Sequence, residues 1–299
     1  MKILLLGSDG QLGKELERQL SSVGSLTAVP RLKLDITNHK ALSDVILCMH
    51  PNIIVNAAAY TAVDMAETDR ELAYAVNSEA VAYLAQLAKV ANALLIHFST
   101  DYVFDGTKQT PYFETDPTNP INVYGASKLA GEQAVVAADC QYLIFRAAWV
   151  IGTDGNNFAK TILKLAAERK HVNVVSDQHG VPTSAALIAK ATVDAIQAVK
   201  KNISWPQGIY HITSTGTSNW HEIAQTLVGF AERQQLQLGT SVANIQAISS
   251  FEYPTSAQRP VNSQLDTSKL RTQLSFDLPH WKVDFLVVAK ELIKEIKVS

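Results

Sequence analysis

The sequence has few cysteines, little net charge and no long apolar run. Cys48 and Cys140 are the only cysteines among 299 residues, and their spacing fits neither a metal site nor a disulfide framework. Lysine and arginine number 26 against 28 acidic residues, which gives no electrostatic reason to expect nucleic acid or an anionic membrane as a partner. No apolar run reaches the length of a membrane span, and the apolar segment at residues 3–6 is too short for a signal peptide. These absences lead us to expect a cytoplasmic protein.

The sequence has a large apolar fraction, arranged as short apolar runs that alternate with amphipathic stretches. Hydrophobic residues make up 47% of the chain and charged residues 18%, as is typical of a globular protein with a large core. In the first half, short apolar runs alternate with stretches that have an apolar residue every three or four positions, such as Leu12, Leu16 and Leu20. We expect strands at 3–6, 26–29, 52–56, 94–98 and 142–147, and helices at 40–49, 69–91 and 124–138. This alternation predicts an α/β fold: a Rossmann-type, doubly wound parallel sheet with helices on both faces.

The pattern is looser after Trp149. Helices are expected at 156–170, 184–200, 219–233 and 283–297, with strands at 172–175 and 208–212. We interpret this half as return visits to the main sheet, interleaved with a smaller C-terminal substrate-binding lobe. The predicted division is a dinucleotide-binding Rossmann domain at 1–150, with return segments near 171–200, and a substrate-binding lobe mainly at 151–170 and 201–299.

Three glycines stand at intervals of three directly after the first expected strand. Gly7, Gly10 and Gly13 suit a tight turn, the close approach of a diphosphate to the backbone, and close helix–strand packing. Gln11 and Leu12 begin the following helix, whose free amides and positive dipole end attract phosphate. A glycine turn alone is weak evidence, but the strand before it and the helix after it favour cofactor binding.

The segment after the second expected strand bears on the choice between NADPH and NADH. An acid at the end of this strand would bind the ribose 2′-hydroxyl, whereas an arginine would accommodate a 2′-phosphate. Here Arg31 follows the strand, Lys33 lies nearby, and the first acid after the strand is Asp35. We therefore predict a preference for NADPH, with NADH possible and Arg31 on the 2′-phosphate. The alternative is that Arg31 is a solvated loop residue.

Two segments carry the residues that ketone reduction needs. Thr100 follows the strand expected at 94–98, and open parallel sheets bind ligands at this edge. Tyr124 and Lys128 are four residues apart and so share one face of a helix. A tyrosine can transfer a proton to the carbonyl oxygen when a nearby ammonium lowers its pKa, and a threonine hydroxyl can donate a hydrogen bond to the growing negative charge. We predict Tyr124, Lys128 and Thr100 as the catalytic residues.

Together these motifs resemble the extended short-chain dehydrogenases/reductases. The segments at 7–13, 99–101 and 124–128 carry this resemblance. Further segments at 56–64, 99–106, 146–150, 155–158, 177–183 and 259–266 resemble the dTDP-4-dehydrorhamnose reductase family, over nearly the whole chain. The resemblance implies that NAD(P)H reduces the C4 keto group of dTDP-4-dehydro-L-rhamnose to give dTDP-L-rhamnose, an activated sugar for surface polysaccharide.

The resemblance also implies roles for further residues. It places Tyr124 as the proton donor and gives Lys128 a hold on the cofactor. Along the cofactor it places Asp35, Ile36, Ala59, Thr61 and Val63. In the sugar site it places Thr100, Asp101, Tyr102 and Trp149. Gln178 and Arg259 are expected at the nucleotide end of the substrate, Arg259 because a guanidinium suits a diphosphate.

Other readings stay open at this point. A sugar-nucleotide 4-epimerase would keep the tyrosine and lysine, whereas a 4,6-dehydratase would need a second acid where Tyr102 stands. A non-catalytic subunit resembling the regulatory beta subunit of methionine adenosyltransferase would lose this chemistry. The resemblance also includes members that form a magnesium-linked dimer through glutamates, and Glu15 matches one of these ligand positions. A second position holds Ala186, which cannot bind a hard cation, so magnesium is doubtful and a homodimer is possible.

Overall fold

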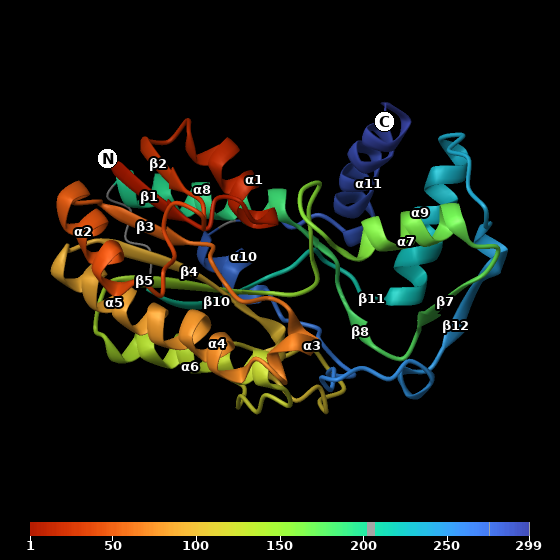
Figure 1. Cartoon of the computed structure of the whole chain (residues 1–299), viewed down its shortest axis with the longest axis horizontal. Coiled ribbons are helices and arrows are strands. Elements are labelled where there is room, and N and C mark those ends of the chain that lie inside the picture. The colour runs from red at the N-terminus through yellow and green to blue at the C-terminus, as the bar shows by residue number, and fades with distance from the viewer. Residues whose placement is uncertain (202–206, 275, 299) are drawn as a thin grey trace.

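A six-stranded, all-parallel sheet forms the centre of the larger part of the molecule. The structure is a computed structural model that describes residues 1–201, 207–274 and 276–298. The strand order is β10-β5-β4-β3-β1-β2 (Figure 1). The strands are β1 (Lys2–Leu6), β2 (Ser25–Val29), β3 (Ile53–Asn56), β4 (Leu94–Thr100), β5 (Tyr142–Ala147) and β10 (Gly208–Ile212). The order changes direction between β1 and β3, and such a switch point is where open parallel sheets bind dinucleotides.

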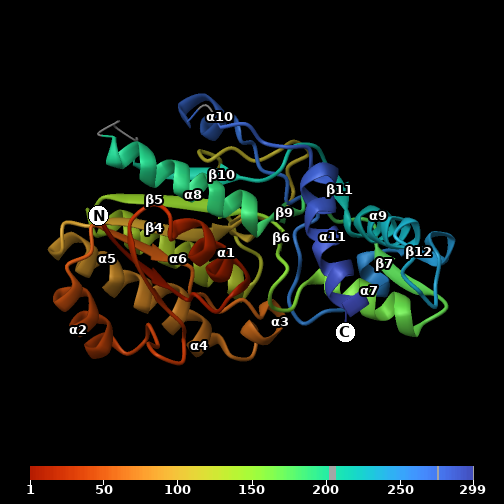
Figure 2. The same ribbon diagram turned by 90° about the horizontal axis from the view of Figure 1, so that it is seen from above.

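Helices cover both faces of this sheet, which confirms the predicted doubly wound α/β fold. Strand residues alternate between the two faces, so Leu5 packs in one core and Leu4 in the other. One face is covered by α1 (Gln11–Leu20) and α8 (Ala185–Lys200), as Figure 2 shows. The other is covered by α2 (His39–Met49), η1 (Ala75–Glu79), α5 (Ala80–Val90) and α6 (Val123–Ala137), and α4 (Arg70–Tyr74) packs against η1 and α6. The expected helix at 69–91 is therefore one helical segment with a π-helical turn, η1, in its middle.

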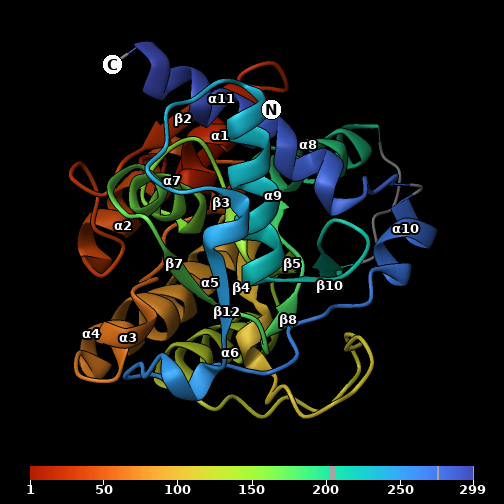
Figure 3. The ribbon, with the colours of Figure 1, turned by 90° about the vertical axis from the view of Figure 1, so that its right-hand side faces the viewer.

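A smaller lobe, which lies in front of the main sheet in Figure 3, has a core of its own. Its core is made mainly by apolar faces of three helices, which pack around Trp281 and Phe285. These helices are α7 (Phe158–Glu168), α9 (Trp220–Arg233) and α11 (Trp281–Val298). The strands of the lobe are β7 (Val172–Val175), β8 (His179–Gly180), β11 (Ser218–Asn219) and β12 (Ile245–Ile248). The remaining short elements are α3 (Val63–Ala66), η2 (Asp101–Val103), β6 (Val150–Ile151), β9 (Thr183–Ser184), η3 (Val242–Asn244), η4 (Ser250–Glu252) and α10 (Ser268–Leu274).

The return of the chain to the main sheet differs in part from the expectation. Within the predicted return segment 171–200, α8 packs on the large sheet, but β7 pairs with β12 in the lobe. In the range 201–299, expected mainly in the lobe, β10 pairs with β5 and α10 packs against β10. The valines at 172, 174 and 175 indicate a strand but do not identify its partner, and β7 is fully buried only at alternate positions. The boundaries of the lobe stay a prediction. Residues 202–206, 275 and 299, which fall in the predicted lobe, lie outside the described part of the chain.

Candidate active site

The glycine turn after β1 has the geometry of a diphosphate cradle. Gly7 has φ +74°, and a Cβ there would lie 2.6 Å from the backbone nitrogen of Ala58, in the loop after β3. A Cβ on Gly13 would lie 2.0 Å from the carbonyl oxygen of Gly7. At Gly10, by contrast, the nearest atom would be 3.6 Å away, so the missing side chain leaves space above the turn. Gly10 is also the N-cap of α1 and makes no side-chain cap, so the helix end is available to a phosphate.

Gln11 and Leu12 turn their side chains away from that space. Gln11 Oε1 accepts hydrogen bonds of 2.9 Å from the Gly152 amide and from Asn157 Nδ2, which ties α1 to the start of the lobe. Leu12 packs against the core on the α1 and α8 face of the sheet. Both residues can therefore contribute only their backbone amides to the cradle.

The residues expected around the adenosine lie beyond β2. Arg31 is exposed, and Ile36 is buried in the core on the α2 face. Asp35 accepts hydrogen bonds from the amide and the hydroxyl of Thr37, at 2.9 and 2.7 Å. These two bonds, with a smaller contribution from the Arg31 charge, lower the pKa of Asp35. Asp35 thus shapes the entry to α2, with its carboxylate bonded to Thr37.

The loop after β3 brings Ala59, Thr61 and Val63 towards the same edge of the sheet. Asn77 holds this loop through two hydrogen bonds to the backbone of Tyr60, accepting from its amide at 2.9 Å and donating to its carbonyl at 3.0 Å. The Asn77 side chain also donates to the hydroxyl of Ser127 on α6, at 3.0 Å. Sequence reasoning missed Asn77, although an asparagine on the apolar face of an expected helix was a usable signal.

Thr100, Tyr124 and Lys128 come together at the end of β4. Thr100 is the last residue of β4, and the helix α6 begins with its N-cap, Asn122, which accepts a 2.7 Å hydrogen bond from the Gly125 amide. A Cβ on Gly125 would lie 2.1 Å from the carbonyl oxygen of Tyr102, so the first turn of α6 packs directly on the segment that follows Thr100.

Contacts among these side chains complete the cluster. The Thr100 hydroxyl donates a 3.1 Å hydrogen bond to Asp101 Oδ1 and lies close enough to the Tyr124 phenol to lower its pKa. Lys128 Nζ donates a 2.6 Å hydrogen bond to the carbonyl oxygen of Phe98 on β4, and only 2% of Lys128 is exposed. The structure therefore brings the three predicted catalytic residues together.

Burial dominates the electrostatics of this cluster. It raises the pKa of the Tyr124 phenol to about 12, against the hydrogen bond from Thr100, and the charge of Asp101 adds to the rise. It lowers the pKa of Lys128 to about 8, although the charge of Glu132 opposes this. We expected Lys128 and the oxidised nicotinamide together to lower the pKa of Tyr124, and for the cofactor-bound protein this stays a prediction, since burial sets the pKa in the protein alone. The phenol is desolvated, and the ammonium is bonded to the backbone of Phe98 instead.

Asp101 and Tyr102 follow Thr100 and extend the site towards the lobe. Asp101 is buried, and this burial raises its pKa to about 7, against hydrogen bonds from Ser263 and Thr100 that lower it. Burial also raises the pKa of Tyr102. The rings of Tyr102 and Tyr124 meet edge to face with their centroids 5.9 Å apart. These residues therefore lie where a substrate bound at Tyr124 would continue.

Trp149 stands where the chain crosses from the sheet to the lobe. Its backbone has φ +46°, and its ring stacks on Trp220 of the lobe with 3.8 Å between centroids. A Cβ on Gly180 would lie 2.6 Å from the Trp149 ring, so this glycine makes room for the indole. The position is compatible with the expected place in the sugar site, and it also packs the two parts of the protein against each other.

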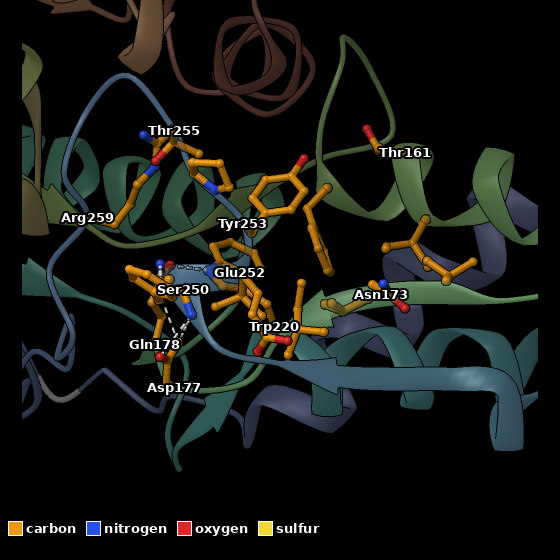
Figure 4. A pocket seen from close by; sticks show the side chains of 18 of the residues that line it. Thr161, Asn173, Asp177, Gln178, Trp220, Ser250, Glu252, Tyr253, Thr255 and Arg259 are labelled. Atoms are coloured by element: carbon orange, nitrogen blue, oxygen red, sulfur yellow. Dashed lines mark hydrogen bonds between the residues drawn. The ribbon is translucent and has the colours of Figure 1, made fainter.

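A groove of about 1620 Å³ runs from Tyr102 across the lobe, lined on the way by Gln178 and Arg259 (Figure 4). Gln178 accepts a hydrogen bond from Trp220 Nε1 at 3.2 Å and donates one to Ser250 Oγ at 2.9 Å. Arg259 forms a bidentate pair with Asp64, at 2.6 and 2.7 Å, so its charge is already partnered. Asp64 and Arg259 are 195 positions apart, and neither their pairing nor the groove residues Trp220 and Ser250 could be identified from the sequence.

The two positions compared with magnesium ligands, Glu15 and Ala186, make other contacts in this chain. The Glu15 carboxylate accepts hydrogen bonds from Arg18 at 2.7 Å and from Gln19 at 2.8 Å. Ala186 presents only its backbone carbonyl, which accepts from the same Gln19. Among the residues described, no group of three or more His, Cys, Asp or Glu could hold a metal ion. The donor set therefore does not fit a hard cation, which needs several oxygen ligands.

Comparisons with known proteins place the chain in a family. Residues 1–294 match the family described as RmlD substrate binding domain. The dTDP-4-dehydrorhamnose reductase of Burkholderia thailandensis is 41% identical over 99% of this chain and 100% of its own length, and that of Escherichia coli K12 is 41% identical over 98% of each. No helix among the described residues is long and apolar enough to cross a membrane.

Solved structures agree with this relationship. The dTDP-4-dehydrorhamnose reductase of Bacillus anthracis, in complex with NADP, is 34% identical with a TM-score of 0.89, covering 97% of this chain and 99% of that one. Its counterpart from Clostridium acetobutylicum has the same identity and TM-score, covering 99% and 100%. The chain belongs to the dTDP-4-dehydrorhamnose reductase family.

Proposed function

We propose that the protein reduces the C4 keto group of dTDP-4-dehydro-L-rhamnose with NADPH, giving dTDP-L-rhamnose. The observation that carries the proposal is the cluster of Thr100, Tyr124 and Lys128 at the carboxyl edge of β4, on the same sheet edge as the open glycine turn. Family membership over nearly the full chain supports the same substrate. The family match, together with this retained cluster, disfavours a non-catalytic subunit.

The fit of the cofactor rests on the cradle at Gly10, where a missing side chain leaves space above a helix end without a cap. Bound NADPH supplies the hydride for the reaction. The residues that would hold it are the turn Gly7, Gly10 and Gly13 with the amides of Gln11 and Leu12, Arg31, Asp35 and Ile36 near the adenosine, Ala59, Thr61 and Val63 along its length, and Tyr124 and Lys128 at the nicotinamide end.

The side chains of the cluster handle the proton and the developing charge. The Tyr124 phenol is protonated throughout the neutral range because its pKa is about 12, so it is ready to donate a proton to the C4 oxygen. The Thr100 hydroxyl, which bonds to Asp101 in the protein alone and lies near this phenol, can turn to the same oxygen as negative charge grows there. The Lys128 ammonium, held by Phe98, keeps a positive charge beside them. As the phenol gives up its proton, this charge stabilises the phenolate that remains.

The substrate extends from the cluster into the groove. Asp101, Tyr102 and Trp149 would surround the sugar, since Tyr102 contacts the Tyr124 ring and also lines the groove. Gln178 and Arg259 would meet the nucleotide end. Because Asp64 neutralises Arg259, a substrate diphosphate would have to share the guanidinium with Asp64 or displace it.

The test is a panel of nucleotide-linked 4-keto sugars assayed for NADPH consumption. We expect dTDP-4-dehydro-L-rhamnose to be turned over, and Tyr124→Phe to abolish turnover while NADPH still binds. Tyr142→Phe, on β5 outside the site, serves as the matched control and keeps full activity. Full turnover in Tyr124→Phe would overturn the mechanism, and failure of the wild-type protein to reduce any of the sugars would overturn the proposed function.

Two further expectations accompany the proposal. We propose a cytoplasmic location, supported by the free thiols of Cys48 and Cys140, since Cys48 is exposed and would oxidise readily elsewhere. A homodimer stays possible and would be measured by light scattering on the purified protein.

A further inference from the structure

Asp9 places a carboxylate at the end of β2, although it belongs to the glycine turn. Its Oδ1 accepts a 3.1 Å hydrogen bond from the backbone amide of Arg31, the second residue after β2. The amides of Gly7 and Ser8, the two residues before Asp9, bond to the carbonyl of Val29 at 3.0 and 3.3 Å, so the turn is fastened to the end of β2. Backbone bonds thus fix the Asp9 main chain beside the end of β2, and its carboxylate is held there by the amide of Arg31.

In dinucleotide-binding sheets, the acid that hydrogen-bonds to the adenosine ribose lies at this end of the second strand. The sequence of β2 has no acid there, and Asp35, the first acid after the strand, is bonded to both the amide and the hydroxyl of Thr37. Asp9 is exposed, and the hydrogen bond from the Arg31 amide uses only its Oδ1 atom. The carboxylate is therefore supplied by the glycine turn instead of the strand.

Asp9 and Arg31 favour opposite cofactors. A carboxylate accepts a hydrogen bond from the free ribose 2′-hydroxyl of NADH and repels the 2′-phosphate of NADPH. A guanidinium attracts that phosphate. Because the Asp9 carboxylate is bonded to the backbone amide of Arg31, the side chain of this arginine begins beside Asp9, and a phosphate that pairs with it lies within the range of the Asp9 charge. We infer that Asp9 is the residue that limits the preference for NADPH and lets the site accept NADH. The inference rests on the proposed function, because it concerns the cofactor of that reaction.

The test measures dissociation constants for NADP⁺ and NAD⁺ by calorimetry, without the sugar substrate. Asp9→Asn removes the charge but keeps an oxygen that can accept from the Arg31 amide, so the turn is retained. We expect it to bind NADP⁺ more tightly and NAD⁺ more weakly, shifting the ratio of the two constants roughly tenfold, as expected when a nearby like charge is removed. Arg31→Ala is expected to shift the ratio the other way.

Asp44→Asn is the matched control, since it makes the same change of charge on α2, where Asp44 pairs with exposed Lys40. A ratio changed less than about twofold by Asp9→Asn, or changed equally by Asp44→Asn, would overturn the inference while leaving the proposed function intact. A wild-type protein that binds neither dinucleotide would overturn both. Equal thermal stability of the wild type and the Asp9 variant confirms that the fold is retained.

Discussion

The Lys128 ammonium is bonded to the carbonyl oxygen of Phe98, two residues before Thr100 on β4, over 2.6 Å. The bond fastens the helix that carries Tyr124 to the strand that carries Thr100. The bond also gives the buried ammonium a hydrogen-bond acceptor, without which burying its charge would be unfavourable. The same contact that joins the helix to the strand thus fixes a buried positive charge in the site, and it leads to the first prediction.

Lys128→Met keeps most of the side-chain length and removes the charge. We expect kcat/KM for NADPH-dependent reduction to fall by roughly 10²–10⁴, because the phenolate left by Tyr124 loses its positive neighbour. The wild-type rate should also fall as pH rises through about 8, the pKa of Lys128, since the ammonium is present below that pH and lost above it. The variant should lack this alkaline limb. A variant that keeps the limb would show that another group causes it.

Asp101 should make the protein less stable at higher pH. Its pKa is raised from 3.8 to about 7 in the folded protein, so the folded state holds a proton that the unfolded state has released between these values. The favourable contribution is full below pH 3.8 and is lost as pH rises through 7. Asp101→Asn should therefore gain stability relative to the wild type at pH 8, by up to about 4 kcal/mol, and little at pH 4.

Urea denaturation at the two pH values measures this difference. Asp177→Asn provides the comparison, since the pKa of Asp177 is lowered and its exposed carboxylate accepts from Ser250. That variant should lose stability at pH 8. Equal effects of pH on the wild type and Asp101→Asn would contradict the raised pKa of Asp101.

Much of the fold could be predicted because its signals are local. The run at β4 is buried at every position, and the spacing of Tyr124 and Lys128 places both on one helical face. The pairing of β7 with β12 could not be predicted, since it depends on which strand lies alongside. The same is true of the Arg259 and Asp64 pair, which joins residues far apart in the sequence. The pKa of Tyr124 depends on burial, which no spacing of residues reveals.

Gly10→Ala and Gly13→Ala should separate cofactor binding from folding. A Cβ on Gly10 meets nothing within 3.6 Å, so that variant should fold with a stability change below about 1 kcal/mol. It should still bind NADP⁺ at least roughly tenfold more weakly, because the methyl group occupies the path of the diphosphate. A Cβ on Gly13 would lie 2.0 Å from the Gly7 oxygen, so that variant should lose about 1–3 kcal/mol or more. Thermal melts and calorimetry report the two effects. Tight NADP⁺ binding by Gly10→Ala would place the diphosphate elsewhere.

Chelation should leave this protein unchanged. Of the two positions compared with magnesium ligands, Glu15 is paired with Arg18, and Ala186 has no side-chain oxygen. A cation bridge between subunits therefore lacks the carboxylate oxygens that it needs. We expect EDTA to alter neither the reduction rate nor the mass measured by light scattering. A shift in mass that magnesium reverses, and calcium does not, would show that other carboxylates assemble the site.

Glu132→Gln should lower the free energy of unfolding, because it leaves the buried charge of Arg146 without its partner. Arg146 on β5 forms a bidentate pair with Glu132 on α6, with distances of 2.9 and 2.6 Å, and both side chains are at most 3% exposed. Arg146 Nη1 is buried without a hydrogen-bond partner among the described residues, so the guanidinium has no alternative acceptor nearby. Removing one partner of a buried pair costs about 3–5 kcal/mol. Urea denaturation should show a loss of this size, whereas Asp194→Asn, in an exposed pair with Lys190, should cost under about 1 kcal/mol.

The same substitution should reach the catalytic lysine through its charge. Glu132 raises the pKa of Lys128 against the effect of burial, so its neutralisation should move the alkaline limb of the pH profile below 8. Replacing both residues of the pair, as Glu132→Gln with Arg146→Met, should recover much of the stability but leave the limb shifted, because the apolar replacement removes the stranded cation without restoring the carboxylate. If the double variant is as unstable as the single one, the loss came from packing and the unpaired charge is not its cause.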